Sequence, residues 1–149
     1  MMTERMGVQD RTDETARRLF DRSLAKAQFK RLAARVTGTP RHLRSLAEDA
    51  RQSGHRRTLG SQIVPLEAIQ GSVDKAQDFD ADFHPLHEAT KERWVSVATA
   101  LRRGITLPQV ELIRVGERYY VVDGHHRVSA SRALGFGHID ALVIEWTLA

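Results

Sequence analysis

The chain has 149 residues, of which 41% are hydrophobic and 28% charged, and this is typical of one folded domain with an appended segment. It contains no cysteine, which excludes disulfide bonds, thiolate catalysis and Cys-ligated zinc sites. No apolar run approaches the roughly 18 residues that would span a bilayer, and MMTERMGVQD at the start lacks the apolar core of a signal peptide. We therefore expect a cytoplasmic protein without membrane association.

Positive charge is concentrated in the first part of the chain. Residues 1–60 carry 14 Lys and Arg against 7 Asp and Glu, whereas residues 61–149 carry 9 against 12, which gives the net charge of +4. This asymmetry favours an N-terminal segment that meets polyanions. A solvated helical surface rich in arginine is the alternative interpretation.

The N-terminal segment is predicted to form a helical hairpin. Residues 1–12 are polar and are expected to be frayed. Apolar residues at helical spacing predict one helix over residues 13–36 and a second over residues 40–53. Such a pair either docks or dimerises, or it reads DNA as a helix-turn-helix. In the DNA-binding interpretation, the phosphate contacts are Arg17, Arg18, Arg31 and Arg35.

The rest of the chain predicts a small α+β unit. We divide the chain into a basic helical segment, residues 1–58, and a second domain, residues 59–149, with residues 55–60 as a linker. Apolar alternation, helical periodicity and glycine stops predict, in chain order, a strand at 61–69, an irregular acidic loop at 70–85, a helix at 88–103, a hairpin of strands at 110–115 and 118–122, a helix at 125–134 and a strand at 139–146.

The stretch VVDGHHRVSAS contains the best candidates for a binding or catalytic site, because cationic side chains lie at the start of a predicted helix. A helix start offers unpaired amides and a partial positive charge, so it binds anions. Cations there are unfavourable without an anion. We therefore predict a phosphate site built by Gly124, His125, His126, Arg127 and Ser129. In the alternative interpretation, Asp123 only caps the helix and the cations are solvated.

Acid–base and metal roles follow from the same stretch. Asp123 ends the predicted strand, where it could hold His126 as an acid or base, ligate Mg²⁺ or accept a proton from a hydroxyl. Adjacent histidines on a helix point about 100° apart, so they rarely ligate one metal ion together. Phe79 and Phe83 are expected to pin the acidic loop to the core.

These residues resemble a known family. Asp123–Arg127, followed by VSASRALG, resembles the signature helix of the ParB/sulfiredoxin superfamily, in which a G-x-x-R box opens a helix after a strand. The stretches IVPLEAI and LPQVEL resemble the first strand of these domains and the entry to their hairpin. The resemblance covers about residues 61–146. It implies a mixed sheet with helices, here preceded by the helical hairpin.

The resemblance implies a nucleotide pocket, with CTP, ATP or ADP as ligand and Mg²⁺ as its companion, and leaves the activity open. Partition proteins of this group bind and hydrolyse CTP with a G-E-R-R box, whose glutamate is missing here. Sulfiredoxins need a cysteine, which this chain lacks. The free-serine kinases share the D-G-H-H-R box and use a glutamate after the first strand as base, for which Glu67 is nearest. We expect a nucleotide-binding protein coupled to DNA, a small-molecule kinase, or a DNA-binding regulator with a vestigial pocket.

Overall fold

The structure is a computed structural model that describes residues 2–38, 41–46, 54–74 and 77–147, with side chains from residue 14 onward. Its centre is a six-stranded mixed sheet with the strand order β1-β3-β5-β4-β6-β2. The strands are β1 (Arg44–Ser45), β2 (His55–Pro65), β3 (Ile69–Ser72), β4 (Val110–Val115), β5 (Arg118–Asp123) and β6 (His138–Thr147).

The sheet combines two kinds of pairing. β4 and β5 form an antiparallel hairpin, and β2 pairs antiparallel with β6. β3 runs parallel to β5, β6 parallel to β4, and the short β1 parallel to β3. The parallel pairing of β3 with β5 matters most for the site, because it places the end of β3 beside the end of β5.

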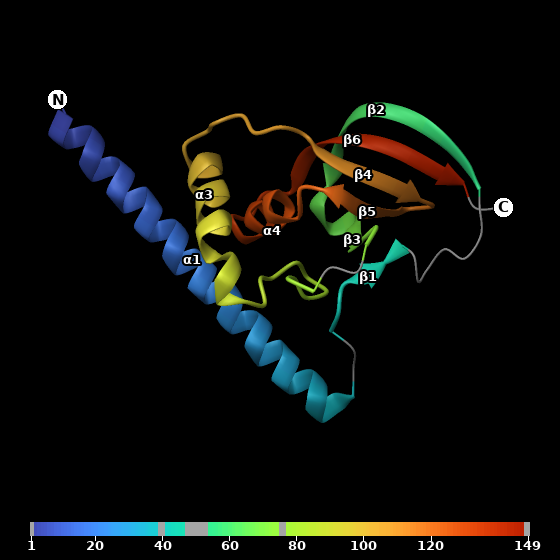
Figure 1. Cartoon of the computed structure of the whole chain (residues 1–149), viewed down its shortest axis with the longest axis horizontal. Coiled ribbons are helices and arrows are strands. Elements are labelled where there is room, and N and C mark those ends of the chain that lie inside the picture. Colours follow the sequence, from blue (N-terminus) through green and yellow to red (C-terminus); the bar gives the residue numbers. More distant parts are fainter. Residues whose placement is uncertain (1, 39–40, 47–53, 75–76, 148–149) are drawn as a thin grey trace.

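Helices cover one side of the sheet, as Figure 1 shows. They are α1 (Met2–Thr37), α3 (Lys91–Arg102) and α4 (His125–Ala133), with short 3₁₀ turns η1 (Leu66–Ala68) and η2 (Glu88–Thr90). α4 packs on α3, and α3 packs on α1, which extends past both. Phe20 of α1 meets Trp94 of α3 edge-on, with ring centroids 5.5 Å apart, and both side chains are fully buried. Among the described residues, no helix has the length and apolar character needed to cross a membrane.

The α+β class with a mixed sheet is confirmed, and so are the predicted elements from residue 88 onward, to within a few residues. Phe79 and Phe83 are 3% and 1% exposed and hold the acidic loop to the core, as predicted. In β6 the buried Ala141 and Val143 alternate with exposed residues, as expected for a strand, whereas in β4 the consecutive Leu112 and Ile113 are both buried.

Three predictions for the N-terminal part were wrong. The first helix begins at Met2 instead of residue 13, since no proline or glycine pair interrupts it. Residues 41–45 are extended instead of helical, because Arg44 and Ser45 pair with β3 at the sheet edge. The rest of that predicted helix, residues 47–53, lies outside the described residues. The predicted linker at 55–60 belongs to β2, where it pairs with β6. β2 therefore runs through the proposed domain boundary at residue 58.

Candidate functional site

The site is built where β5 ends and α4 begins. Gly124 links them with a φ of +110°, in the left-handed region that side chains disfavour. A Cβ at this position would lie 2.5 Å from Val110 Cγ1. The neighbour that requires a glycine here is Val110 of β4. The glycine thus sets the direction in which α4 leaves the sheet.

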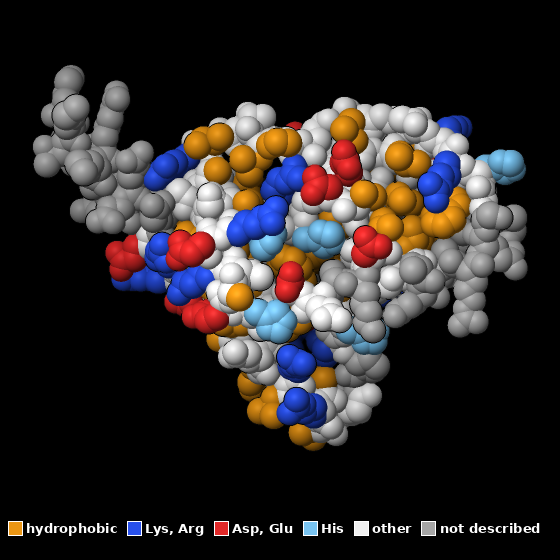
Figure 2. Space-filling view, in the orientation of Figure 1, with side chains coloured by type: hydrophobic (Ala, Val, Ile, Leu, Met, Phe, Trp, Pro, Cys, Tyr) orange, Lys and Arg blue, Asp and Glu red, His pale blue; other side chains and the backbone are white. Residues whose placement is uncertain are grey.

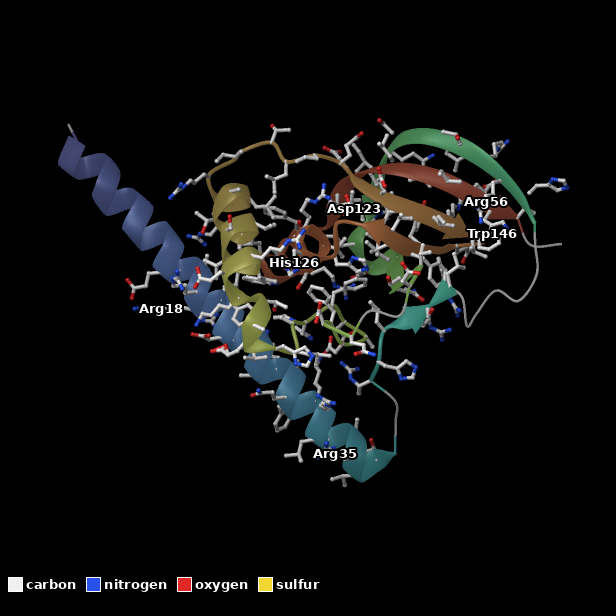
Figure 3. The ribbon with its side chains drawn as sticks, viewed as in Figure 1. Arg18, Arg35, Arg56, Asp123, His126 and Trp146 are labelled. Carbon is white, nitrogen blue, oxygen red and sulfur yellow. The ribbon has the colours of Figure 1, made fainter. Side chains whose placement is uncertain are left out.

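A cavity of ≈ 810 Å³ opens at the start of α4. Figure 2 shows its surroundings, with histidine side chains among basic and acidic ones near the centre of the face, and Figure 3 labels Asp123 and His126 there. Five predicted site residues line it together, namely Asp123, Gly124, His125, His126 and Arg127. The other lining residues are Ser72, Asp74, Gln77, Asp78, Phe79, Arg93, Val97, Leu107 and Pro108.

The two histidines are held by packing. The His125 ring is stacked on Phe79 at 6.1 Å between centroids and 14° between planes, and its Nε2 lies 2.8 Å from Ser72 Oγ. The His126 ring meets Phe79 edge-on, at 5.2 Å. Its Nδ1 is buried and has no hydrogen-bond partner within the part of the chain that the structure describes. Both rings are thereby fixed at the cavity wall with limited freedom.

His125 and His126 are not the cationic pair that the sequence predicts, because the pKa of each is lowered. Burial lowers the pKa of His125, against the opposing effect of Asp123, Asp74 and Asp78. Burial also lowers the pKa of His126, and the charge of Arg93 adds to this effect. Both imidazoles are therefore neutral at pH 7, when no ligand is bound. A bound anion would act in the opposite direction and favour their protonated forms.

Arg127 is largely committed to the protein itself. Its Nη1 donates to the carbonyl oxygens of Pro108 and Gln109, the second at 3.0 Å, and its Nη2 donates to Asp123 Oδ2 at 3.2 Å. The side chain is 15% exposed. The sequence predicts Arg127 as part of a phosphate site, but in the structure its guanidinium mainly ties the segment before β4 to the start of α4. Its remaining N–H groups line the cavity.

The amides at the start of α4 have no side-chain cap. The first bond of the helix runs from the Val128 N–H to the Gly124 carbonyl. The N-cap residue is a glycine and has no side chain with which to cap the helix, and the hydrogen bond that Asp123 accepts within the described residues comes from Arg127 Nη2. The Asp123 carboxylate is instead 68% exposed beside Arg127. Gly124 is buried, and with His125, His126 and Arg127 it lines the cavity, so the first turn of α4, where helix amides lack intrahelical partners, forms part of the cavity wall.

Two predicted residues lie elsewhere. Ser129 is 2% exposed, accepts a hydrogen bond from Trp94 Nε1 at 2.8 Å and donates to the Phe83 carbonyl, so its hydroxyl serves the core and not this cavity. Glu67 is exposed in η1 and does not line the cavity. The structure therefore gives Glu67 no contact from which to act as a base on a ligand bound there.

Several cavity residues escaped prediction because their elements are distant in sequence. Arg93 of α3, Ser72 at the end of β3, and Asp74 reach the cavity only through tertiary packing. The one available signal was the acidic loop predicted at residues 70–85. Asp78 of that loop does line the cavity.

A second polar cluster in this loop is explained by internal pairing. One carboxylate oxygen from each of Asp80 and Asp82 and one ring nitrogen of His84 lie within 4.8 Å of one another. Asp80 Oδ1 accepts from the amides of Asp82 and His84, both at 2.9 Å. Asp82 pairs with Lys30 at 3.0 Å and with Arg41. This cluster fastens the loop to α1 and to the segment before β1.

No family model matches the chain, and no curated protein matches it either. Among solved structures, the crystal structure of sulfiredoxin from Arabidopsis thaliana is similar, with a TM-score of 0.45 and 21% identity over 58% of this chain and 86% of that one. A similarity of this degree does not bear on ligand or chemistry. Membership of the ParB/sulfiredoxin superfamily stays a prediction based on the D-G-H-H-R stretch.

Proposed function

We propose that the chain binds a nucleotide in the cavity at the start of α4. The observation that carries this proposal is the first turn of α4, whose amides have no side-chain cap and whose N-cap residue, Gly124, is buried at the cavity. The amides of a helix start need hydrogen-bond acceptors, and a phosphate group supplies several together with negative charge. The phosphates of CTP, ATP or ADP would occupy this end.

The side chains around the helix start suit a polyphosphate. Arg93 adds a guanidinium from α3, and it has no ion pair among the described residues. His125 and His126 can each donate a hydrogen bond, and a bound phosphate would favour their protonated forms. Arg127 would contribute only the N–H groups that Pro108, Gln109 and Asp123 leave unused.

The remaining walls divide the cavity into two kinds of surface. Val97, Leu107 and Pro108 form an apolar part that would take the base or sugar. Asp74, Asp78 and Asp123 place carboxylates along the wall, and carboxylates are the protein ligands that Mg²⁺ prefers. They would hold Mg²⁺ only together with the phosphates, because Mg²⁺ retains waters and shares ligands with its nucleotide.

The test is isothermal titration with CTP, ATP and ADP, with and without Mg²⁺. We expect one of these nucleotides to bind, and Arg93→Ala to weaken it about tenfold or more by removing a charge-assisted hydrogen bond. Arg102→Ala is the matched control, since Arg102 is exposed on the same helix and does not line the cavity. Absence of binding by all three nucleotides, or equal weakening by both variants, would contradict the proposal.

Phosphoryl transfer is an alternative function at the same cavity. The observation that favours it is Asp123, whose exposed carboxylate lies at the cavity where it could accept a proton from a hydroxyl. Phosphorus NMR of ATP or ADP incubated with serine and other small alcohols would detect a new phosphate ester. If the nucleotides stay intact, a binding function remains and a kinase does not.

DNA binding through α1 is the other alternative. Of the four arginines predicted for it, Arg17 pairs with Glu92 at 2.8 Å and Arg18 with Glu14 at 2.6 Å. Arg31 and Arg35 are exposed at the far end of α1, where Figure 3 labels Arg35. A DNA-binding function therefore predicts that Arg31→Ala/Arg35→Ala reduces a salt-dependent affinity for duplex DNA, and that Arg17→Ala matters less.

A homodimer would use the same end of α1. Phe29, Leu32 and Val36 are exposed there by 73%, 62% and 86%, which is unusual for apolar side chains at helical spacing. Sedimentation equilibrium of the chain and of Leu32→Asp would test this partner. A monomer at all concentrations would exclude the homodimer without affecting nucleotide binding.

A further inference from the structure

A second cavity, of ≈ 410 Å³, lies between α1, α4 and the loop at residues 82–84. This cavity has no lining residue in common with the proposed nucleotide cavity within the described part of the chain. Its lining is predominantly cationic and polar, with Arg22, Lys26 and Lys30 from α1 facing Arg132 from α4. The other lining residues are Leu19, Ser23, Asp82, Phe83, His84, Ser129 and Ala133.

The cations on α1 form a row along one side of the helix. Arg18, Arg22, Lys26 and Lys30 follow one another at intervals of four residues, which places them on neighbouring turns. The two ends of the row are neutralised, Arg18 by Glu14 at 2.6 Å and Lys30 by Asp82 at 3.0 Å. Within the described residues, Arg22 and Lys26 in the middle have no ion pair.

The opposite wall adds a third cation whose charge is not compensated. Arg132 is half-buried, and its Nη1 donates to the Leu66 carbonyl at 3.3 Å, while its guanidinium lies 5.9 Å from the centre of the Phe83 ring. Among the described residues of the lining, the only carboxylate is that of Asp82, which is already shared between Lys30 and Arg41. Arg22, Lys26 and Arg132 thus share one recess without an acidic partner among its described residues.

On the side of α1 that faces α3, by contrast, the charged side chains are paired. Towards α3, Arg17 pairs with Glu92 at 2.8 Å, and Asp21 pairs with Lys91 at 2.8 Å. Like charges at intervals of four residues destabilise a helix when nothing opposes them. The flank that packs on α3 is balanced by carboxylates, and the flank that lines the cavity is not.

We infer that this second cavity binds a small phosphorylated dianion, held by Arg22 and Lys26 of α1 and by Arg132 of α4. Two forked guanidinium groups and an ammonium suit the oxygens of a phosphate monoester or of inorganic phosphate. The volume of the recess, ≈ 410 Å³, suits a small phosphorylated molecule better than a continuous polyanion such as a nucleic-acid backbone. The inference does not rest on nucleotide binding in the first cavity.

The test is a titration with inorganic phosphate and with glucose 6-phosphate at constant ionic strength, followed by the Arg Nε–H signals in ¹H–¹⁵N NMR spectra. We expect the signals of Arg22 and Arg132 to shift saturably, and the signals of Arg31 and Arg35 to stay in place. Tighter binding of glucose 6-phosphate would indicate a phosphate monoester as the ligand, and tighter binding of inorganic phosphate would indicate the free ion. Arg22→Ala/Lys26→Ala should weaken this binding about tenfold or more.

Two controls distinguish a site from general electrostatic attraction. Arg31→Ala/Arg35→Ala removes the same charge from the same helix outside the cavity, and it should leave phosphate binding unchanged. Arg93→Ala alters only the first cavity and should also have no effect, which separates this inference from the proposed function. Thermal unfolding verifies that each variant is folded.

Three results would overturn the inference. One is the absence of saturable shifts with either phosphate. Another is equal weakening by Arg31→Ala/Arg35→Ala, which would indicate a diffuse basic surface. The third is binding of duplex DNA that depends on Arg22 and Lys26 while both small phosphates fail to bind.

Discussion

The Nε2 atom of His125 lies 2.8 Å from the Oγ atom of Ser72, and this contact joins the start of α4 to the end of β3. The two residues are 53 positions apart in the sequence. They meet because β3 runs parallel to β5, with Ser72 paired to Val121, two residues before the end of β5. The pairing of β3 with β5 therefore places Ser72 in the wall of the proposed nucleotide cavity. The Ser72 hydroxyl in turn helps to orient the His125 ring.

Ser72→Ala should lower the free energy of unfolding by about 1 kcal/mol, because it leaves a half-buried imidazole nitrogen without its hydrogen-bond partner. Urea denaturation measures the change. The control is Ser96→Ala on the exposed face of α3, which we expect to stay within about 0.5 kcal/mol of the unmodified chain. If the two variants are equally stable, the contact between Ser72 and His125 contributes nothing.

Stability should fall as the pH decreases through about 6.5, the ordinary pKa of histidine. Burial lowers the pKa of His125 and His126 in the folded state, so the unfolded chain takes up protons first on acidification. Their contribution is complete above the unfolded pKa and is lost as the pH falls towards the folded pKa. Urea midpoints between pH 8 and pH 5 measure this loss, as rough limits of the histidine range.

His126→Gln should reduce this pH dependence, because it removes one of the two groups. His138→Gln is the control, since His138 is exposed at the start of β6. A slope that is unchanged in His126→Gln would show that other groups cause it. A bound phosphate favours the protonated form of both histidines. Nucleotide affinity should therefore rise as the pH falls over the same range.

Gly124→Ala should destabilise the fold by about 3 kcal/mol or more, since the residue has a φ of +110° and its Cβ would approach Val110 Cγ1 to 2.5 Å. Gly135→Ala provides the comparison, because Gly135 also has a positive φ, +81°, but has nothing within 4 Å of the added Cβ. That variant should cost only about 1–2 kcal/mol. Equal costs in thermal or urea unfolding would show that Val110 does not restrict this position.

The local part of the site could be predicted because it is continuous in sequence. Strand-forming residues, then Gly124, then a helical pattern place Asp123–Arg127 at a helix start whatever the rest of the fold does. The later strands and helices were predictable for a similar reason, since alternation or helical spacing shows directly which side chains are buried. Local pattern therefore determined most of the fold after residue 88.

The rest depended on tertiary pairing, which no local pattern shows. β1 has two residues and forms because the edge of β3 offers unpaired backbone groups. Arg93 reaches the cavity because α3 packs against α4. The roles of His125 and Arg127 changed for the same reason: burial makes the imidazole neutral, and nearby carbonyl oxygens occupy the guanidinium.

Arg127→Lys should destabilise the fold by about 1.5–3 kcal/mol, although it keeps the charge. A lysine cannot span the Pro108 and Gln109 carbonyls and the Asp123 carboxylate at once. Arg118→Lys at the exposed first residue of β5 is the control and should be neutral. Asp123→Asn should cost less than about 1 kcal/mol because its carboxylate is largely exposed. If urea unfolding shows that Asp123→Asn destabilises the fold as much as Arg127→Lys or more, the ion pair with Asp123, and not the two carbonyl contacts, is the main stabilising contact of Arg127.

Asp82→Asn should make the chain less sensitive to acid. Burial acts to raise the pKa of Asp82, but hydrogen bonds from Arg41 and Lys30 outweigh it and hold the pKa at about 2, below the ordinary 3.8. A lowered folded pKa contributes stability that is present above pH 3.8 and is lost as the pH falls towards 2. The variant should therefore lose about 1 kcal/mol at neutral pH, allowing for partial exposure, and approach the unmodified chain at low pH.

Acid unfolding followed by circular dichroism measures this difference, with Asp140→Asn as the control because Asp140 is exposed in β6 and has no ion pair among the described residues. Asp82 joins Lys30 of α1 to Arg41 before β1, so its protonation loosens the attachment of α1 to the loop. The same change frees Lys30 in the second cavity, so Asp82→Asn should also strengthen phosphate binding there. Parallel acid curves for Asp82→Asn and the unmodified chain would mean that this ion-pair cluster does not hold α1 in place.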